Sequence, residues 1–173
     1  MKILLVSDTH GMNENLKKAV QREKPFDYLI HCGDTDDEWR EIESMAGTLC
    51  TFVRGNNDYD RVLTDTARLL FEGVKIYVTH GHRLRVHYGH EGVIREAKKF
   101  GCSIAAYGHT HRPVIDDSDP ELLILNPGSL TYPRQPGRQP SYIVLTIEKG
   151  QKPRAEIRFI KRKEVIYVIK TTI

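Results

Sequence analysis

The sequence of 173 residues has little cysteine, a single tryptophan and no long apolar run. Its three cysteines, at positions 32, 50 and 102, lack the CxxC spacing of zinc and redox motifs, and their odd number argues against a disulfide framework. The apolar run at residues 3–6 is too short for a secretion signal, and no run is long enough to cross a bilayer. We therefore predict a reduced, cytoplasmic protein that makes no membrane contact.

An excess of one charge is also missing. The formal net charge is +3, from 26 basic and 23 acidic residues, and so weak an imbalance does not argue for nucleic acid as a partner. The sequence has no internal repeat, low-complexity tract or linker, and its length is that of one domain with a sizeable core. We predict a single domain over residues 1–173, and the sequence carries no signal for its oligomeric state.

Hydrophobic patterns predict strands that alternate with helices in the first half of the chain and consecutive strands in the second half. We expect helices at residues 13–23, 37–46 and 91–100, closed by Pro25, Gly47 and Gly101. Strands are expected at residues 3–7, 28–31, 49–53, 68–71, 75–79, 104–107, 114–116, 122–125, 142–147, 155–160 and 165–169. This order predicts an α/β fold in which helices cover two packed sheets.

Six short segments rich in histidine, aspartate and asparagine occur in a fixed order, nearly all of them directly after a predicted strand. They are Asp8-Thr9-His10, Gly33-Asp34, Gly55-Asn56-Asn57-Asp58, His80-Gly81-His82, Gly108-His109-Thr110-His111 and Asn126-Pro127-Gly128-Ser129. Strand ends are where an α/β fold gathers its chemistry. Because alternate residues of an extended chain share a face, Asp8 and His10 can reach one ion, and so can His109 and His111.

Each segment taken alone also has an ordinary structural explanation. A lone aspartate after a strand, such as Asp8 or Asp34, is more often a helix N-cap, and a lone His80 is more often a hydrogen-bonded structural residue. The complete set argues for metal binding, because chance does not put so many ligand types at strand ends. Carboxylate, imidazole and amide ligands suit Mn²⁺, Fe²⁺, Ni²⁺ or Zn²⁺. The segments offer seven such ligands, which suit two adjacent ions if the Asp34 carboxylate binds both. The seven are Asp8, His10, Asp34, Asn56, His80, His109 and His111.

These motifs, DxH, GD, GN, H and GHxH, resemble those of the calcineurin-like metallophosphoesterases, and within them the small single-domain phosphodiesterases of bacteria and archaea. The match covers about residues 1–147 and leaves a strand-like tail at 155–173 outside it. The resemblance implies the four-layer fold of that family, a two-sheet β-sandwich flanked by helices, with two metals at one end. It implies one metal on Asp8, His10 and His111, another on Asn56, His80 and His109, and Asp34 between them.

The same resemblance implies a phosphodiesterase in which a hydroxide between the two metals attacks phosphorus. Many members carry a histidine directly after the motif asparagine, where this sequence has Asn57. An amide can donate a hydrogen bond but not a proton, so we predict that substrates with acidic leaving groups are favoured. His82 is an alternative proton donor if its segment is extended and shares a face with His80, although a turn or supporting role suits it equally well.

Four residues outside the metal-binding motifs carry weaker signals. Arg112 and Arg134 lie in predicted loops and could hold a substrate phosphate through bidentate hydrogen bonds, whereas a solvated role is the commoner one for any single loop arginine. His87 and His90 belong to a basic stretch, and we expect them on the surface.

Two other functions remain open alongside a phosphodiesterase acting on a small phosphoester. A nuclease would use the same ligands, although the modest charge does not favour nucleic acid, and salt-sensitive binding would reveal it. A non-catalytic scaffold is the third possibility, since the retromer subunit with this fold is an interaction protein with a degraded metal site. The ligand set is intact in this sequence, which favours catalysis.

Overall fold

The computed structural model describes residues 1–160 and 169–172. In this part of the chain, no helix combines the length and the apolar character needed to span a membrane. The strand predicted at 165–169 falls almost entirely outside the described residues, and the strand described there, β11, covers Ile169–Thr172.

The first sheet has six strands in the order β11-β10-β9-β1-β2-β3. Three of them are parallel neighbours joined by helical crossovers, namely β1 (Lys2–Val6), β2 (Tyr28–His31) and β3 (Leu49–Phe52). The other side of β1 pairs antiparallel with β9 (Ser141–Thr146), which is followed by β10 (Arg154–Phe159) and β11. The first sheet therefore combines parallel strands from the first half of the chain with antiparallel strands from its end.

The second sheet has five strands in the order β4-β5-β6-β8-β7. Its hairpin consists of β4 (Thr66–Phe71) and β5 (Val74–Thr79), as the sequence predicts. Parallel pairing then joins β5 to β6 (Ile104–Ala106) and β6 to β8 (Leu122–Pro127), and β7 (Pro113–Asp119) closes the sheet antiparallel to β8. β8 extends two residues beyond the predicted strand at 122–125, so the first two residues of the Asn126-Pro127-Gly128-Ser129 segment belong to a strand.

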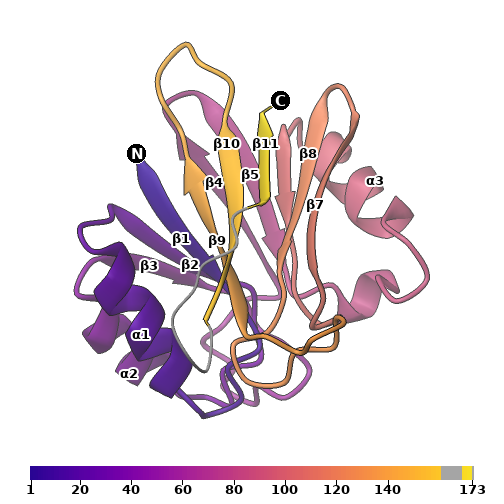
Figure 1. Ribbon diagram of the computed structural model, residues 1–173. Helices are drawn as coiled ribbons and strands as arrows, with labels where there is room; N and C mark the ends of the chain where they lie inside the picture. Colours follow the sequence, from indigo (N-terminus) through magenta and orange to yellow (C-terminus); the bar gives the residue numbers. More distant parts are fainter. Residues whose placement is uncertain (161–168, 173) are drawn as a thin grey trace.

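Helices cover the outer face of each sheet, which gives the four layers seen in Figure 1. The helices α1 (Glu14–Glu23) and α2 (Trp39–Ala46) pack on the first sheet, and α3 (Glu91–Lys99) packs on the second. The two sheets enclose a core to which β1 contributes Ile3 and Leu5, while Leu4 and Val6 face the helices. The predicted α/β sandwich with flanking helices is confirmed.

The loops that follow β1, β2, β5 and β6 gather at one end of the sandwich, the lower end in Figure 1. They gather because these strands run in the same direction, so their carboxyl ends meet at the same edge of the two sheets. One short element in this region was not expected from the sequence, a single 3₁₀ turn, η1, at His82–Leu84. The shared edge is therefore the place where the predicted ligands can meet.

The buried carboxylate of Glu23 links the end of α1 to β10, a strand that lies outside the part of the chain matched by the family motifs. Glu23 is 1% exposed and accepts hydrogen bonds from Arg158 at 2.6 and 2.7 Å and from the hydroxyl of Tyr142 at 2.8 Å, with Lys2 Nζ at 3.0 Å. Burial alone would raise the pKa of Glu23, but these three partners outweigh it and hold the pKa below its usual value. The ionised form of Glu23 therefore stabilises the fold.

We predict that Glu23→Gln lowers the free energy of unfolding at pH 7 by about 2 kcal/mol, the scale of hydrogen bonds to charged groups. Because the folded pKa is depressed, this stabilisation exists above the ordinary glutamate pKa and is lost as the pH falls through the folded value. The difference between wild type and variant in urea denaturation should thus shrink below about pH 4. The exposed Glu121→Gln is the control, and equal stability of Glu23→Gln and wild type at pH 7 would contradict the prediction.

Candidate metal centre

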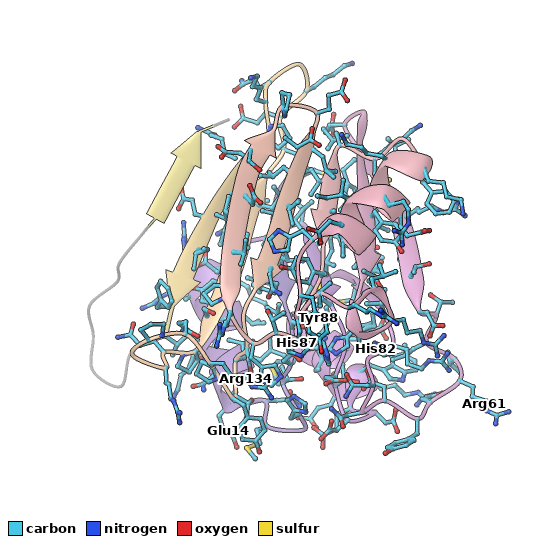
Figure 2. All side chains as sticks on the ribbon, turned by 90° about the vertical axis from the view of Figure 1, so that its right-hand side faces the viewer. Glu14, Arg61, His82, His87, Tyr88 and Arg134 are labelled. Carbon is cyan, nitrogen blue, oxygen red and sulfur yellow. The ribbon has the colours of Figure 1, made fainter. Side chains whose placement is uncertain are left out.

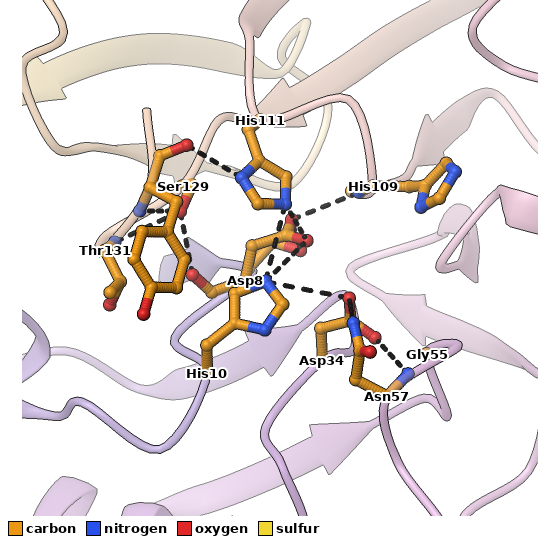
Figure 3. A network of polar contacts seen from close by, with 12 residues as sticks. Asp8, His10, Asp34, Gly55, Asn57, His109, His111, Ser129 and Thr131 are labelled. Atoms are coloured by element: carbon orange, nitrogen blue, oxygen red, sulfur yellow. Dashed lines mark hydrogen bonds and ion pairs between the residues drawn. The ribbon is translucent and has the colours of Figure 1, made fainter. Parts of the chain in front are cut away.

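Three predicted ligands lie close together. Two of them, Asp8 and His10, follow β1, and the third, His111, lies in the loop between β6 and β7. The Nε2 atom of His111 lies 3.1 Å from Asp8 Oδ1 and 3.4 Å from His10 Nε2. His10 Nε2 lies 3.9 Å from the same Asp8 oxygen. These atoms point toward one another in Figure 3, and all lie close enough to coordinate one ion.

A second group lies beside the first. His80 Nε2 is 3.4 Å from Asp34 Oδ2 and 3.1 Å from the amide oxygen of Asn56. Asp34 Oδ2 is also 3.7 Å from His10 Nε2, so this carboxylate lies between the two groups. The His109 ring, 5.0 Å from that of His80, completes the seven.

The grouping differs in one respect from that implied by the resemblance. Asp8, Asp34 and His80 also present atoms within 4.8 Å of one another, so Asp8 takes part in both groups of candidate ligands. Both carboxylates therefore lie next to both prospective metal positions. The division of ligands between two metals, with Asp34 as the bridge, stays a prediction.

The surroundings of Asp8 fit a cation. Asp8 is fully buried, and its Oδ2 accepts hydrogen bonds from Ser7 Oγ at 2.6 Å and from the backbone N–H of His109 at 3.1 Å. Among the residues that the structure describes, no donor is aligned with Oδ1, although His111 Nε2 is near. A buried carboxylate oxygen without a hydrogen bond is costly, and a divalent cation at this position would satisfy it.

The protonation states of the two carboxylates and of His109 favour metal binding. Burial would raise the pKa of Asp8, but the contact with His111 and the nearby His80 outweigh it and lower that pKa. The same balance, with His80 and the amide of Asn57 as partners, holds the pKa of Asp34 far below its usual range. Burial, together with His80 and His87, lowers the pKa of His109 to about 4, so this ring is neutral and has a free lone pair. Ionised carboxylates and neutral imidazoles are the forms that bind metals. At His80, burial opposes the charged form, but the contact with Asp34 outweighs it and raises the pKa, so a metal bound there would displace a proton.

The ligand loops have an unusual backbone. Five of the seven candidate ligands have left-handed φ angles, which non-glycine residues seldom adopt: Asp8 (55°), His10 (47°), Asp34 (57°), His109 (65°) and His111 (57°). Such strain persists only where surrounding contacts enforce it, and it clusters at functional sites. These tight turns aim successive side chains at one point instead of alternating them across the sheet.

The motif glycines are explained by close packing around the same carboxylates. A Cβ atom on Gly55 would lie 2.0 Å from Asp34 Oδ1, and one on Gly108 would lie 2.0 Å from Ser7 Oγ. Neither position has room for a side chain. The glycine before each ligand thus allows two loops to approach one another.

Backbone carbonyls orient the histidines from behind. The Nδ1–H of His80 donates to the carbonyl of Cys32 at 2.7 Å, and that of His111 donates to the carbonyl of Tyr132 at 2.7 Å. Each bond fixes the tautomer that leaves Nε2 free for a metal. Sequence reasoning missed these contacts, because a backbone carbonyl carries no residue-type signal.

Asp58 ties the second and third ligand loops together. Its carboxylate accepts hydrogen bonds from the backbone N–H groups of Asp34 at 2.9 Å, Thr35 at 2.8 Å and Gly55 at 2.7 Å. The acidic residue at the end of the Gly55-Asn56-Asn57-Asp58 motif was the available signal for this role. Asp58 therefore supports the geometry from beneath the ligands.

Of the two residues predicted to assist catalysis, Asn57 lines the cavity at the ligands, and only His82 departs from the expected backbone conformation. The Asn57 side chain donates to Asp34 Oδ2 at 2.7 Å and its backbone N–H to Asp34 Oδ1 at 2.9 Å, so in this structure it holds a candidate ligand. His82 is not in an extended segment, as the shared-face argument required, but begins the 3₁₀ turn η1. Its ring lies 5.4 Å from that of His80, outside the set of residues that line the cavity at the ligands.

That cavity, of about 170 Å³, is lined by five candidate ligands together with Asn57, Tyr132 and Arg134. Arg134 is thus near the position where a bound phosphate would sit, while Arg112 lines a neighbouring cavity. His87, expected at the surface, is exposed but faces the centre, with its ring 4.5 Å from that of His109. His90 is half-buried and hydrogen-bonds the Tyr107 hydroxyl at 2.8 Å.

The 126–129 segment is a structural support of the site. The Asn126 side chain donates to the carbonyl of Gly108 at 2.9 Å, and Ser129 Oγ donates to the carbonyl of Asp8 at 2.8 Å. Both contacts hold ligand loops in place (Figure 3 draws Ser129 beside Asp8). The last of the six polar segments in the sequence therefore supports the ligand loops.

Comparison with known proteins agrees with this geometry. The family model of the calcineurin-like phosphoesterase superfamily domain matches residues 1–150. The probable metallophosphoesterase YsnB of Bacillus subtilis is 35% identical over 162 residues, which cover 92% of this chain and 90% of that protein. Phosphodiesterase MJ0936 of Methanocaldococcus jannaschii is 31% identical over 148 residues, which cover 74% and 83% of the two chains.

Among solved structures, a zinc complex of Vps29 from Entamoeba histolytica has a TM-score of 0.82 with this chain. The sequences are 19% identical, and the alignment covers 99% of this chain and 98% of that one. At this identity the likeness concerns the fold alone.

We predict that Asp34→Asn loses at least one of two bound metal ions, because the amide offers one neutral oxygen where the carboxylate offers two charged ones. Metal content should be measured by mass spectrometry after Mn²⁺ loading and dialysis. Asp117→Asn, an exposed residue on β7, is the matched control and should keep the wild-type content. Two ions per chain in Asp34→Asn would refute the proposed position of the metals.

Proposed function

Because the chain belongs to the calcineurin-like phosphoesterase superfamily, we propose that it is a two-metal phosphohydrolase acting on small phosphodiesters. The observation that carries the proposal is the convergence of seven ligand-type side chains at one edge of the sheets, where Asp8 Oδ1 lacks a hydrogen bond. Mn²⁺, Ni²⁺, Fe²⁺ or Zn²⁺ suits this imidazole-rich set better than Mg²⁺, which prefers oxygen ligands. The three free cysteines further support a reducing, cytoplasmic setting.

The residues have distinct roles in this proposal. Asp8, His10 and His111 would hold one cation, Asn56, His80 and His109 the other, and Asp34 would bind both. When bound, two such cations supply a water nucleophile at neutral pH and neutralise charge on the phosphoryl oxygens. Arg134 at the rim of the same cavity would orient the phosphate by bidentate hydrogen bonds.

Neither residue predicted to assist catalysis is well suited to protonate the leaving group. The Asn57 amide is committed to Asp34, and His82 lies in a 3₁₀ turn and not in the extended segment that would align it with His80. Burial, together with His80 and Arg83, lowers the pKa of His82, which further limits it as an acid at neutral pH. We therefore infer that the protein relies on leaving groups that depart without a proton.

The two alternative functions fit less well. A scaffold would not need seven ligands, two buried charged carboxylates and strained loops, all of which cost stability. A nuclease would share the centre, but a net charge of +3 offers little attraction for a polyanion. A small phosphoester is therefore the proposed substrate.

We predict that a chelator abolishes hydrolysis of bis(p-nitrophenyl) phosphate. Added Mn²⁺ or Ni²⁺ should restore the rate better than Mg²⁺, because imidazole ligands favour the former ions. The assay is release of p-nitrophenol after dialysis against each metal. Full activity in the presence of chelator, or equal rescue by Mg²⁺ alone, would count against the proposal.

We also predict that the hydrolysis rate depends steeply on leaving-group acidity, with aryl diesters cleaved readily and alkyl esters poorly. Asn57→His should selectively accelerate the poor leaving groups, by at most the ~10²–10⁴-fold of general acid catalysis. Metal content is measured in parallel, because Asn57 also holds Asp34. A rate that barely changes across leaving groups, with chemistry rate-limiting, would mean that an acid is present, and His82→Ala would then identify or exclude His82.

A further inference from the structure

A second cavity, of about 400 Å³, adjoins the candidate metal centre. Its polar lining consists of Tyr107, His87, His90, Thr110, Arg112 and Arg134, and Arg134 lines the metal-centre cavity as well. His87 marks the boundary between the two, since its ring lies 4.5 Å from that of the candidate ligand His109. Figure 2 shows His87 and Arg134 at the same end of the sandwich.

The charge of this second cavity is positive. Two guanidinium groups line it, and none of its lining residues carries a carboxylate in the described part of the chain. Neither Arg112 nor Arg134 has an acidic partner within ion-pairing distance among the described residues, whereas Arg54 and Arg158 are paired. Asp116 lies 3.4 Å from His90 Nδ1 and is engaged by that ring.

The wall of the cavity is held in place before any ligand arrives. His90 is fixed by the hydroxyl of the buried Tyr107 on one nitrogen and by Asp116 on the other. Thr110 Oγ1 accepts a hydrogen bond from the Asn126 side chain at 3.0 Å, and the same side chain supports the carbonyl of Gly108. A prearranged wall lowers the ordering cost of binding.

We propose that this second cavity binds another phosphate of the substrate, so that the protein prefers phosphoesters whose organic part carries an additional phosphate. The proposal rests on the proposed function, because it takes the first phosphate to lie at the metal centre. Unpaired arginines beside an acid-free cavity are suited to bidentate capture of a phosphate. Arg134, shared by the two cavities, would lie between the two phosphates.

The test compares two probes that differ only by one phosphate, thymidine 5′-phosphate and thymidine 3′,5′-bisphosphate. Their dissociation constants are measured by calorimetry on the metal-loaded protein. We expect the bisphosphate to bind at least roughly tenfold tighter, the scale of a hydrogen bond to a charged group. Arg112→Gln should remove most of this difference in affinity. Arg112→Lys keeps the positive charge but lacks the paired N–H donors of the guanidinium, so it should retain part of the difference.

Arg138→Gln is the matched control, since Arg138 is exposed in the same loop as Arg134 and lines neither cavity. It should keep the full preference for the bisphosphate. Equal affinity of the wild type for the two probes, or the same preference in Arg112→Gln as in wild type, would overturn the inference. Hydrolysis of bis(p-nitrophenyl) phosphate by the same preparation tests the proposed function separately, so the two failures are distinguishable.

Discussion

The buried carboxylate of Asp8 is the constraint on which the site depends. An ionised carboxylate without water is expensive unless hydrogen bonds and opposite charges compensate it. Ser7 and the backbone of His109 satisfy one oxygen, and Ser129 holds the Asp8 carbonyl, so three loops distant in sequence are joined at this residue. The remaining oxygen faces His10 and His111. A cation at this position would compensate the buried charge of that oxygen, so the conformation of these loops is suited to metal binding.

The strand that presents Asp8 is buried on both of its faces. Ile3 and Leu5 pack between the sheets, while Leu4 and Val6 pack against the helices, so β1 cannot shift without disturbing both apolar clusters. This anchoring allows left-handed conformations in the following loop, each of which costs of order 1 kcal/mol or more. The apolar core thus provides the rigidity that holds the ligand geometry.

The strands and the ligand set could be predicted because both are local signals. Apolar runs locate β1, β2 and β5 closely, and the order of the motifs brings the ligands to one edge. The 3₁₀ turn at His82 could not be predicted, because Gly81 adopts a φ of 99° and turns the chain out of the extended form that residue spacing assumes. Two further features could not be predicted, because they depend on loop conformations that contacts distant in sequence determine. One is the orientation of His87 toward His109, and the other is the hydrogen bond from Asn57 to Asp34.

In the proposed function, chemistry and recognition are carried by different parts of this fold. The candidate ligands follow buried strands, whose positions are fixed by the core, and supporting carbonyls and Asp58 restrict them further. Arg112 and Arg134, by contrast, lie in exposed loops with few partners of their own. Changes in those loops would alter the second cavity without disturbing β1 or Asp8. Substrate preference can therefore vary among proteins of this fold while the metal-binding edge of the sheets stays the same.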